Sequence, residues 1–113
     1  MVGLRISIIG CGRWGSFLAW YLDSIGYHVT LYGRQSSQKL AVLHRNRTNG
    51  LVSLSDRVVL TSDLEEAAAS QILVISIGAQ SFRSLMQQLS SFNLEGKAVV
   101  LCMKGLESGT GKR

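Results

Sequence analysis

Hydrophobic positions along the chain alternate between short β-rich runs and longer stretches with helical spacing. The short runs predict five strands, which span 4–9, 28–32, 58–60, 72–77 and 98–102. The stretches between them predict four helices, at 14–25, from 36 or 37 to about 47, at 63–69 and at 81–92. Strands that alternate with helical crossovers form parallel sheets with helices on both faces. The pattern therefore predicts an α/β fold, a Rossmann-type doubly wound parallel sheet of about five strands.

Local signals predict where the helices begin and end. Gly26 ends the first helix, as a glycine just beyond the last turn does. Ser36 or Ser37 caps the second helix, and Ser62 caps the third. Three- and four-residue spacings predict the inward positions, which are Phe17, Leu18, Tyr21, Leu22 and Ile25 in the first helix and Leu40 and Leu43 in the second. The segment 49–56 has no strong pattern and is expected to be a loop.

Length and composition limit the class of protein. The 113 residues fit one domain, and a content of 46% apolar and 17% charged residues argues against a disordered chain. No apolar run reaches the roughly 18 residues that a membrane-spanning helix needs. A signal peptide is not expected, because glycines and Arg13 follow the first apolar run too soon. Since Cys11 and Cys102 show no C-x-x-C spacing, the sequence predicts a cytoplasmic protein with reduced thiols.

Positive charge is unevenly distributed along the chain, whose formal net charge is +5. The stretch from 24 to 55 contains no acidic residue, whereas Arg34, Lys39, Arg45 and Arg47 all fall within it. Such a stretch indicates an anionic partner, which can be a nucleic acid, a membrane surface or a phosphorylated small molecule. A solvated basic face is the alternative interpretation.

The segment GCGRWG places Gly10, Gly12 and Gly15 in the spacing G-x-G-x-x-G, directly after a strand and at the start of a helix. In such a turn the first glycine permits the tight bend, and the second lets a pyrophosphate approach the backbone. The third lets the helix pack closely on the strand, and the helix N-terminus offers unpaired N–H groups to the phosphates. A glycine-rich turn without a ligand is the alternative, but the strand-helix-strand context favours a dinucleotide-binding site.

The residues after the second predicted strand distinguish between the nicotinamide cofactors. NAD-specific folds place an acidic residue there to bind the ribose 2′-hydroxyl. No acidic residue occurs at 31–35, and Arg34 stands where a guanidinium can bind a 2′-phosphate through two hydrogen bonds. Ser36, Ser37 and Lys39 can add further donors. NADP(H) is therefore predicted to be preferred and NAD(H) to be possible, since Arg34 can instead stack on adenine and tolerate both.

Lys104 is the one candidate catalytic residue that position alone suggests. It follows the fifth predicted strand, at the carboxyl end where open α/β sheets bind ligands; a surface lysine is the alternative. Asp63, Glu65 and Glu66 suit the positive end of a helix dipole better than a metal ion, so no metal site is predicted. Cys11 is expected to be a small buried residue rather than a reactive thiol.

Five segments of the chain resemble one known family. They are GCGRWG, HVTLYGR, TSDLEEA, ILVISIGAQSF and MKGLESGTG. Together they are similar to the N-terminal domain of NAD(P)-dependent glycerol-3-phosphate dehydrogenase, over nearly the whole chain. The tryptophan inside the glycine motif and the K-G-L-E segment are the specific parts of this resemblance. Two departures are Met103, where the family has threonine, and 77–79, where the fourth strand of the family ends in V-P-S or V-P-H.

The resemblance implies roles for several residues. Arg13 and Trp14 lie where family members contact the NADPH pyrophosphate and ribose, and Arg34 matches the residue that meets the 2′-phosphate. Lys104 matches a lysine beside both the nicotinamide and the substrate. The implied reaction is hydride transfer between NAD(P)H and dihydroxyacetone phosphate, which gives sn-glycerol 3-phosphate for phospholipid synthesis. Residues 1–113 would then be the dinucleotide-binding, N-terminal part of a longer enzyme, without the helical C-terminal domain and its proton donor.

Two other functions remain compatible with the residues: a stand-alone NADP-binding sensor or regulatory module, and the cofactor domain of a related dehydrogenase. The chain alone is expected to be inactive, because it lacks the family's substrate pocket. The expected partner is a small-molecule substrate, dihydroxyacetone phosphate or glycerol 3-phosphate, with no nucleic acid and no membrane. A homo-oligomer is possible, because an uncovered edge at the fifth strand can pair with another chain.

Overall fold

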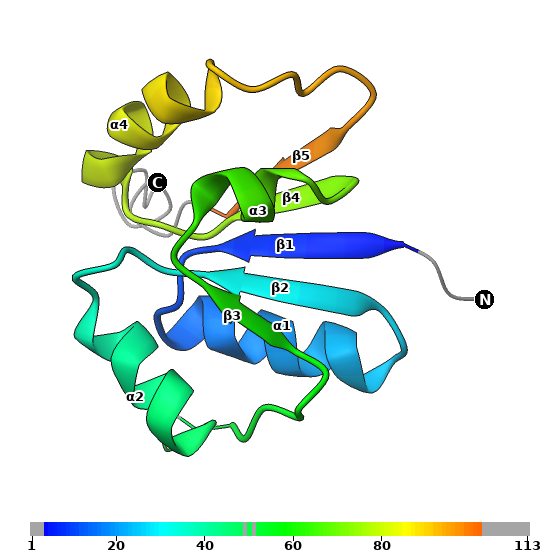
Figure 1. Ribbon diagram of the computed structural model, residues 1–113, viewed down its shortest axis with the longest axis vertical. Coiled ribbons are helices and arrows are strands. Elements are labelled where there is room, and N and C mark those ends of the chain that lie inside the picture. The colour runs from blue at the N-terminus through cyan, green and yellow to red at the C-terminus, as the bar shows by residue number, and fades with distance from the viewer. Residues whose placement is uncertain (1–3, 49, 51, 103–113) are drawn as a thin grey trace, which may run out of the picture.

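The computed structural model describes residues 4–48, 50 and 52–102. Strands and helices alternate along this part of the chain, in the order β1 (Arg5–Ile9), α1 (Arg13–Ser24), β2 (His28–Tyr32), α2 (Gln38–Asn46), β3 (Val59–Thr61), α3 (Leu64–Ala68), β4 (Ile72–Ile75), α4 (Ala79–Leu89) and β5 (Ala98–Leu101) (Figure 1). These strands form one sheet in the order β3-β2-β1-β4-β5, in which every pairing is parallel. The predicted doubly wound α/β fold is confirmed.

The strand order reverses at β1, which pairs with β2 on one side and with β4 on the other. The chain therefore crosses from one half of the sheet to the other between β3 and β4. At such a switch point the segments that follow two adjacent strands lead to opposite faces of the sheet, which leaves a crevice at the carboxyl ends. The turns after β1 and β4 border this crevice.

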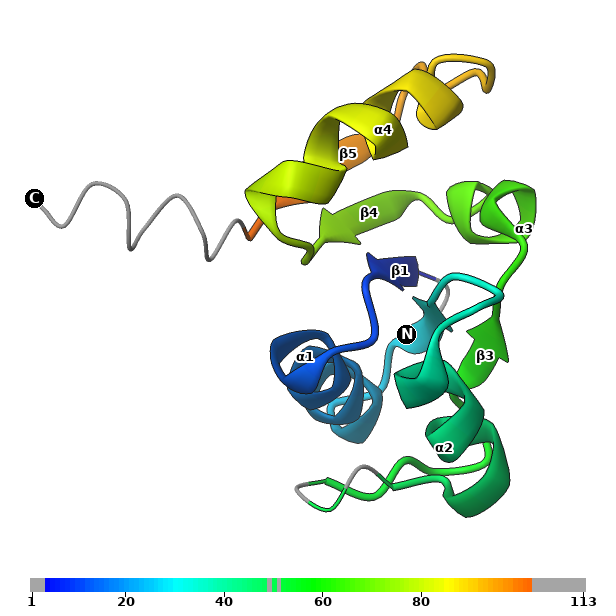
Figure 2. The ribbon, with the colours of Figure 1, turned by 90° about the vertical axis from the view of Figure 1, so that its left-hand side faces the viewer.

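Two apolar cores cover the two faces of the sheet, and Figure 2 shows the two pairs of helices on opposite sides. The core beneath α1 and α2 includes Ile6, Ile8, Ala19, Val29, Leu31, Leu40 and Leu43. The core beneath α3 and α4 includes Ile9, Ala67, Ala68, Ile75, Leu85 and Leu89. Successive side chains of a strand point to opposite faces, so Ile8 and Ile9 of β1 serve different cores. The predicted inward positions of the second helix, Leu40 and Leu43, are confirmed as buried.

The inward face of α1 differs from the predicted one. Phe17, Tyr21 and Ile25 were expected to point inward, but they are 38%, 47% and 53% exposed. The buried positions of this helix are Gly15, Ser16, Ala19 and Asp23. A side chain at Gly15 would collide with the carbonyl oxygen of Gly10, so α1 lies too close to β1 for large side chains to fit between them. The face with small residues therefore turns inward, and the aromatic face turns outward.

The caps of the helices agree with the sequence at α2 and differ at α3. The hydroxyl of Ser37, one of the two predicted caps, accepts a hydrogen bond from the backbone N–H of Leu40 at 3.1 Å. Ser62 does not cap α3; the carboxylate of Asp63 accepts a hydrogen bond from the N–H of Glu65 at 3.0 Å instead. A carboxylate at this position satisfies a free N–H group and also complements the helix dipole, which explains why it displaces the serine.

Several elements begin or end a few residues from their predicted bounds. The third strand spans 59–61 rather than 58–60, β4 ends at Ile75 rather than at 77, and α4 spans 79–89 rather than 81–92. No side chain caps α4, whose N-cap is Gly78, so the sequence contains no polar capping signal at its start. Gly26 does end α1, with a positive φ of 107° that favours glycine.

Strand β5 forms one edge of the sheet and is the least covered of the strands. It pairs with β4, and within the described ranges no other strand lies beside it. Val99, Val100 and Leu101 are 40%, 46% and 52% exposed. Among the described residues, no helix has both the length and the hydropathy needed to cross a bilayer.

Candidate functional site

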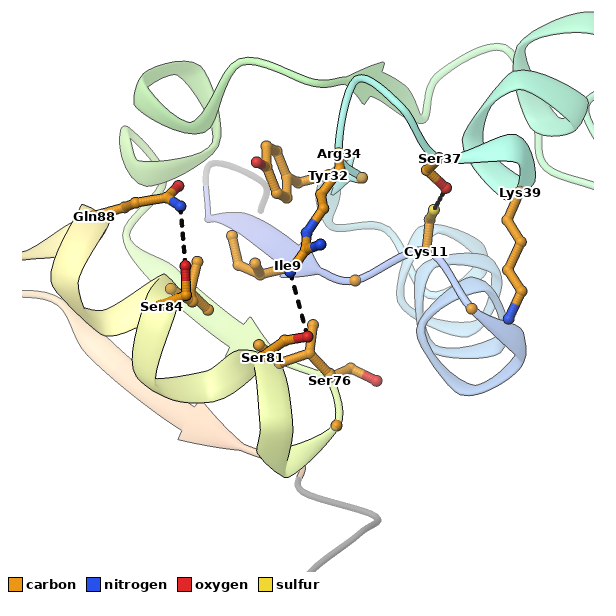
Figure 3. Close-up of a pocket in the computed structure, with 16 residues that line it drawn as sticks. Ile9, Cys11, Tyr32, Arg34, Ser37, Lys39, Ser76, Ser81, Ser84 and Gln88 are labelled. Carbon is orange, nitrogen blue, oxygen red and sulfur yellow. Dashed lines mark hydrogen bonds between the residues drawn. The ribbon is translucent and has the colours of Figure 1, made fainter.

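A cleft of about 560 Å³ opens at the carboxyl ends of β1, β2 and β4, where the strand order reverses. One wall consists of the glycine turn after β1 and the segment that joins β2 to α2. The other wall consists of the turn after β4 and the first turns of α4 (Figure 3). Open α/β sheets bind their ligands at this position, so the fold itself indicates the candidate site.

The three glycines of the turn after β1 serve two different purposes. Gly10 has a φ of +123°, and a Cβ on it would collide with the carbonyl oxygen of Ser76. A Cβ on Gly15 would collide in the same way with Gly10, so both positions are closed by protein backbone. At Gly12 an added Cβ would stand 3.7 Å from Lys39 Nζ, an ordinary van der Waals distance. Gly12 is therefore the glycine whose missing side chain leaves space on the cleft side.

Three helices begin at the cleft, and none of them carries an acidic residue in its first turn. The N-caps of α1 and α4 are Gly12 and Gly78, which provide no side-chain acceptor for the first N–H groups. Helix α3 does not line the cleft, and its first turn contains Glu65 and Glu66. Free N–H groups and the positive ends of helix dipoles favour a bound anion. The difference between these helices thus indicates that the cleft is suited to phosphate groups.

The acid-free stretch from 24 to 55 divides into a structural part and a part that faces the cleft. Arg47 is structural, because its guanidinium donates hydrogen bonds to the backbone carbonyls of Ser55 and Val58. Arg34 and Lys39 instead line the cleft. Among the described residues that line it there is no aspartate or glutamate, so Arg34 and Lys39 dominate the charge of this part of the cleft.

Arg34 lies on the exposed rim of the cleft and reaches across it. Its Nη2 atom donates a hydrogen bond to the hydroxyl of Ser81 on α4, at 3.3 Å (Figure 3). The preceding residue, Gly33, packs closely on the glycine turn: a Cβ there would lie 2.6 Å from the sulfur of Cys11. Cys11 is buried, as predicted, and its sulfur lies 3.5 Å from the hydroxyl of Ser37. The glycine turn and the start of α2 are therefore packed directly against each other.

The structure separates the site residues that the sequence predicted. Gly10, Gly12 and Arg34 line the cleft, while Gly15 lies beneath the turn. Arg13 and Trp14 line a neighbouring cavity of about 530 Å³ instead, where the Trp14 ring stacks on that of Phe17 at 5.5 Å. Lys104 and Met103 lie outside the described residues.

Sequence reasoning missed the wall that α4 contributes. Ser81, Ser84 and Gln88 line the cleft from this helix (Figure 3). Their spacing of three and four residues marks one polar helix face, which is a signal that the sequence contains. Only the tertiary structure shows that this face looks toward the glycine turn. In the described part of the chain, no group of three or more His, Cys, Asp and Glu side chains is placed to hold a metal ion.

The chain is similar in sequence to curated bacterial proteins. It is 36% identical over 109 residues to the glycerol-3-phosphate dehydrogenase (NAD(P)+) of Afipia carboxidovorans. It is also 36% identical over 110 residues to the protein of the same name from Parvibaculum lavamentivorans. These alignments cover 95% and 94% of this chain but 34% and 33% of the two relatives. The chain thus spans about a third of the length of these relatives.

A solved structure of glycerol-3-phosphate dehydrogenase from Coxiella burnetii has the same fold as this chain. The two superpose with a TM-score of 0.81 at 20% identity, over 94% of this chain and 34% of that one. Residues 5–113 also match the family described as NAD-dependent glycerol-3-phosphate dehydrogenase N-terminus. Because this match takes in all but the first four residues, the chain belongs to that family, as its sequence motifs indicated.

Proposed function

We propose that residues 1–113 are the dinucleotide-binding, N-terminal part of a glycerol-3-phosphate dehydrogenase. The observation that carries this proposal is the open space at Gly12, in a cleft that lies at the strand-order reversal and whose described lining contains no acidic residue. The family match supports it independently. The chain spans about a third of its curated relatives, so the remaining part of such an enzyme would have to contribute the rest of the active site.

The residues of the cleft fit a nicotinamide dinucleotide. Gly12 would give the pyrophosphate access to the backbone, and the start of α1 would offer it first N–H groups that no side chain caps. Gly10 and Gly15 keep strand, turn and helix close enough together for this approach. Arg13 and Trp14, in the first turn of α1, are proposed from the family resemblance to contact the pyrophosphate and the ribose.

The proposed preference is for NADP(H), with Arg34 as the residue that recognises the 2′-phosphate. Its guanidinium is held at the cleft by a neutral serine, so within the described residues no carboxylate competes with a phosphate for it. Positions 31–35 contain no carboxylate to accept a hydrogen bond from the ribose 2′-hydroxyl of NAD(H). Planar, two-point recognition of phosphate is the interaction that arginine makes best.

The proposed reaction is reduction of dihydroxyacetone phosphate to sn-glycerol 3-phosphate, for which the bound nicotinamide supplies the hydride. Lys104 is proposed to place a positive charge beside the nicotinamide and the substrate. The proton donor and most of the substrate pocket are assigned to a helical C-terminal domain. We further propose that the enzyme is cytoplasmic and that its partner is this small molecule rather than nucleic acid or membrane.

Calorimetric titration of NADPH and NADH tests the cofactor assignment. Arg34→Gln should reduce the affinity for NADPH by about tenfold or more, because a charge-assisted hydrogen bond contributes roughly 1.5–3 kcal/mol. The same substitution should change the affinity for NADH only slightly. Arg45→Gln is the matched control, because Arg45 is an exposed arginine in the last turn of α2 and does not line the cleft. Equal wild-type affinities for the two cofactors would contradict the assigned role of Arg34.

A further inference from the structure

Lys39 occupies a position where helix electrostatics disfavour a cation. It is the second residue of α2, at the positive end of the helix dipole, whereas His44 and Arg45 stand in the favourable last turn. Among the described residues Lys39 forms no ion pair and no hydrogen bond that would offset this cost. Stability of the helix therefore gives no reason for a lysine here, and an anionic ligand does.

The side chain of Lys39 extends from α2 toward the first turn of α1 (Figure 3). Its Nζ atom lies 3.7 Å from the point where a Cβ on Gly12 would stand, and no other atom of the described residues, apart from the immediate chain neighbours, lies within 4 Å of that point. The ammonium group thus borders the space left free by Gly12. Gly12 is the N-cap of α1, so this space adjoins the helix start, where the first N–H groups have no side-chain cap.

The two cations of the cleft are directed at different places. Arg34 extends to Ser81 on α4, while Lys39 extends to the glycine turn. Building on the proposed function, we infer that Lys39 binds the pyrophosphate of the dinucleotide and that only Arg34 recognises the 2′-phosphate. NADH and NADPH share the pyrophosphate, so Lys39 determines affinity for both cofactors and selectivity between them depends on Arg34. The sequence alone placed Lys39 with Arg34, Ser36 and Ser37 as a donor to the 2′-phosphate, whereas this inference assigns it to the pyrophosphate.

Titration of the protein with NADH, NADPH and adenosine 2′-monophosphate tests this division. The last ligand carries the 2′-phosphate without a pyrophosphate. Lys39→Met removes the charge and keeps the length of the side chain. It should reduce the affinities for NADH and NADPH by the same factor, about tenfold, and leave the affinity for adenosine 2′-monophosphate unchanged. The unfolding temperature of the ligand-free variant should be equal to or slightly above that of the wild type, because an unfavourable charge has been removed from the helix start.

Arg45→Met is the matched control, since it removes a cation from the same helix at the end away from the cleft and should bind all three ligands as the wild type does. Wild-type affinity of Lys39→Met for both dinucleotides would overturn the inference. A loss confined to NADPH and adenosine 2′-monophosphate would also overturn it, because Lys39 would then belong to the 2′-phosphate site. If the wild type binds neither dinucleotide, the proposed function fails as well, so the two failures are distinguishable.

Discussion

A methyl group added at Gly15 should lower the stability of the fold, whereas one added at Gly12 should lower the affinity for the dinucleotide. In Gly15→Ala the new Cβ would overlap the carbonyl oxygen of Gly10 and lie 3.4 Å from Ile8 Cγ2. Alanine is normally favoured over glycine in a helix by about 0.5–1 kcal/mol, but the collision is with backbone, which cannot rotate away. Overpacking of this kind costs about 1–3 kcal/mol. We therefore expect Gly15→Ala to lower the free energy of unfolding despite its higher helix propensity.

Gly12→Ala provides the contrasting case. Within the described part of the chain its Cβ would meet the flexible end of Lys39 alone, at 3.7 Å, so the fold has room for it. Loss of the glycine N-cap should cost less than about 1 kcal/mol. The methyl group nevertheless occupies the space that a pyrophosphate needs, so dinucleotide affinity should fall. Gly12→Val, with a larger side chain, should abolish binding while the circular dichroism spectrum stays native-like.

Urea unfolding and NADPH titration of the same variants separate the two effects. Gly15→Ala should lower the urea concentration at the unfolding midpoint, by roughly 0.3–1 M for a loss of about 1 kcal/mol, because m is about 1–3 kcal/mol/M in small domains. Gly12→Ala and Gly12→Val should change binding far more than stability. The reasoning is refuted if Gly15→Ala is as stable as the wild type. It is also refuted if Gly12→Val binds NADPH with wild-type affinity, because the phosphates would then lie elsewhere.

Three further predictions follow from the fold and the proposed function. Asp23 is buried and accepts hydrogen bonds from Ser55 at 2.8 Å and from Arg57 at 3.2 Å, so Asp23→Ala should lower the unfolding free energy by about 1–2 kcal/mol. Arg57→Gln is its control in urea unfolding and should cost less than about 1 kcal/mol, because that side chain is 74% exposed. Val100→Lys should reduce concentration-dependent self-association in sedimentation, since a charge on the edge strand β5 opposes pairing with a second copy. An unchanged mass distribution would show that this edge does not form the contact between copies. NADPH consumption with dihydroxyacetone phosphate should stay at the uncatalysed background for residues 1–113 alone, because general acid catalysis normally contributes about 10²–10⁴-fold; robust turnover would show a complete site within them.

Local features of the sequence were enough to predict the fold and the position of the cleft. Alternating β-rich and helical runs predicted five strands and four helices, because hydrophobic periodicity is a property of neighbouring residues. The spacing of Gly10, Gly12 and Gly15 after a strand predicted the turn at the start of α1, and the structure has it there. Gly26 and Ser37 were recognised for the same reason, since caps act within one turn of their own helix.

Tertiary structure decided which side of each element faces the core or the cleft. The spacing of apolar residues placed Phe17 and Tyr21 inside, but the close approach of α1 to β1 at Gly15 admits only small side chains. The hydrogen bond from Arg34 to Ser81 joins residues 47 positions apart, and it exists because the strand order brings β2 and β4 to either side of β1. Contacts between segments distant in the sequence likewise decide that Gly12 is the glycine with free space and that Lys39 is the cation beside it. Periodicity carries no information about such contacts, because they depend on how closely elements pack in three dimensions.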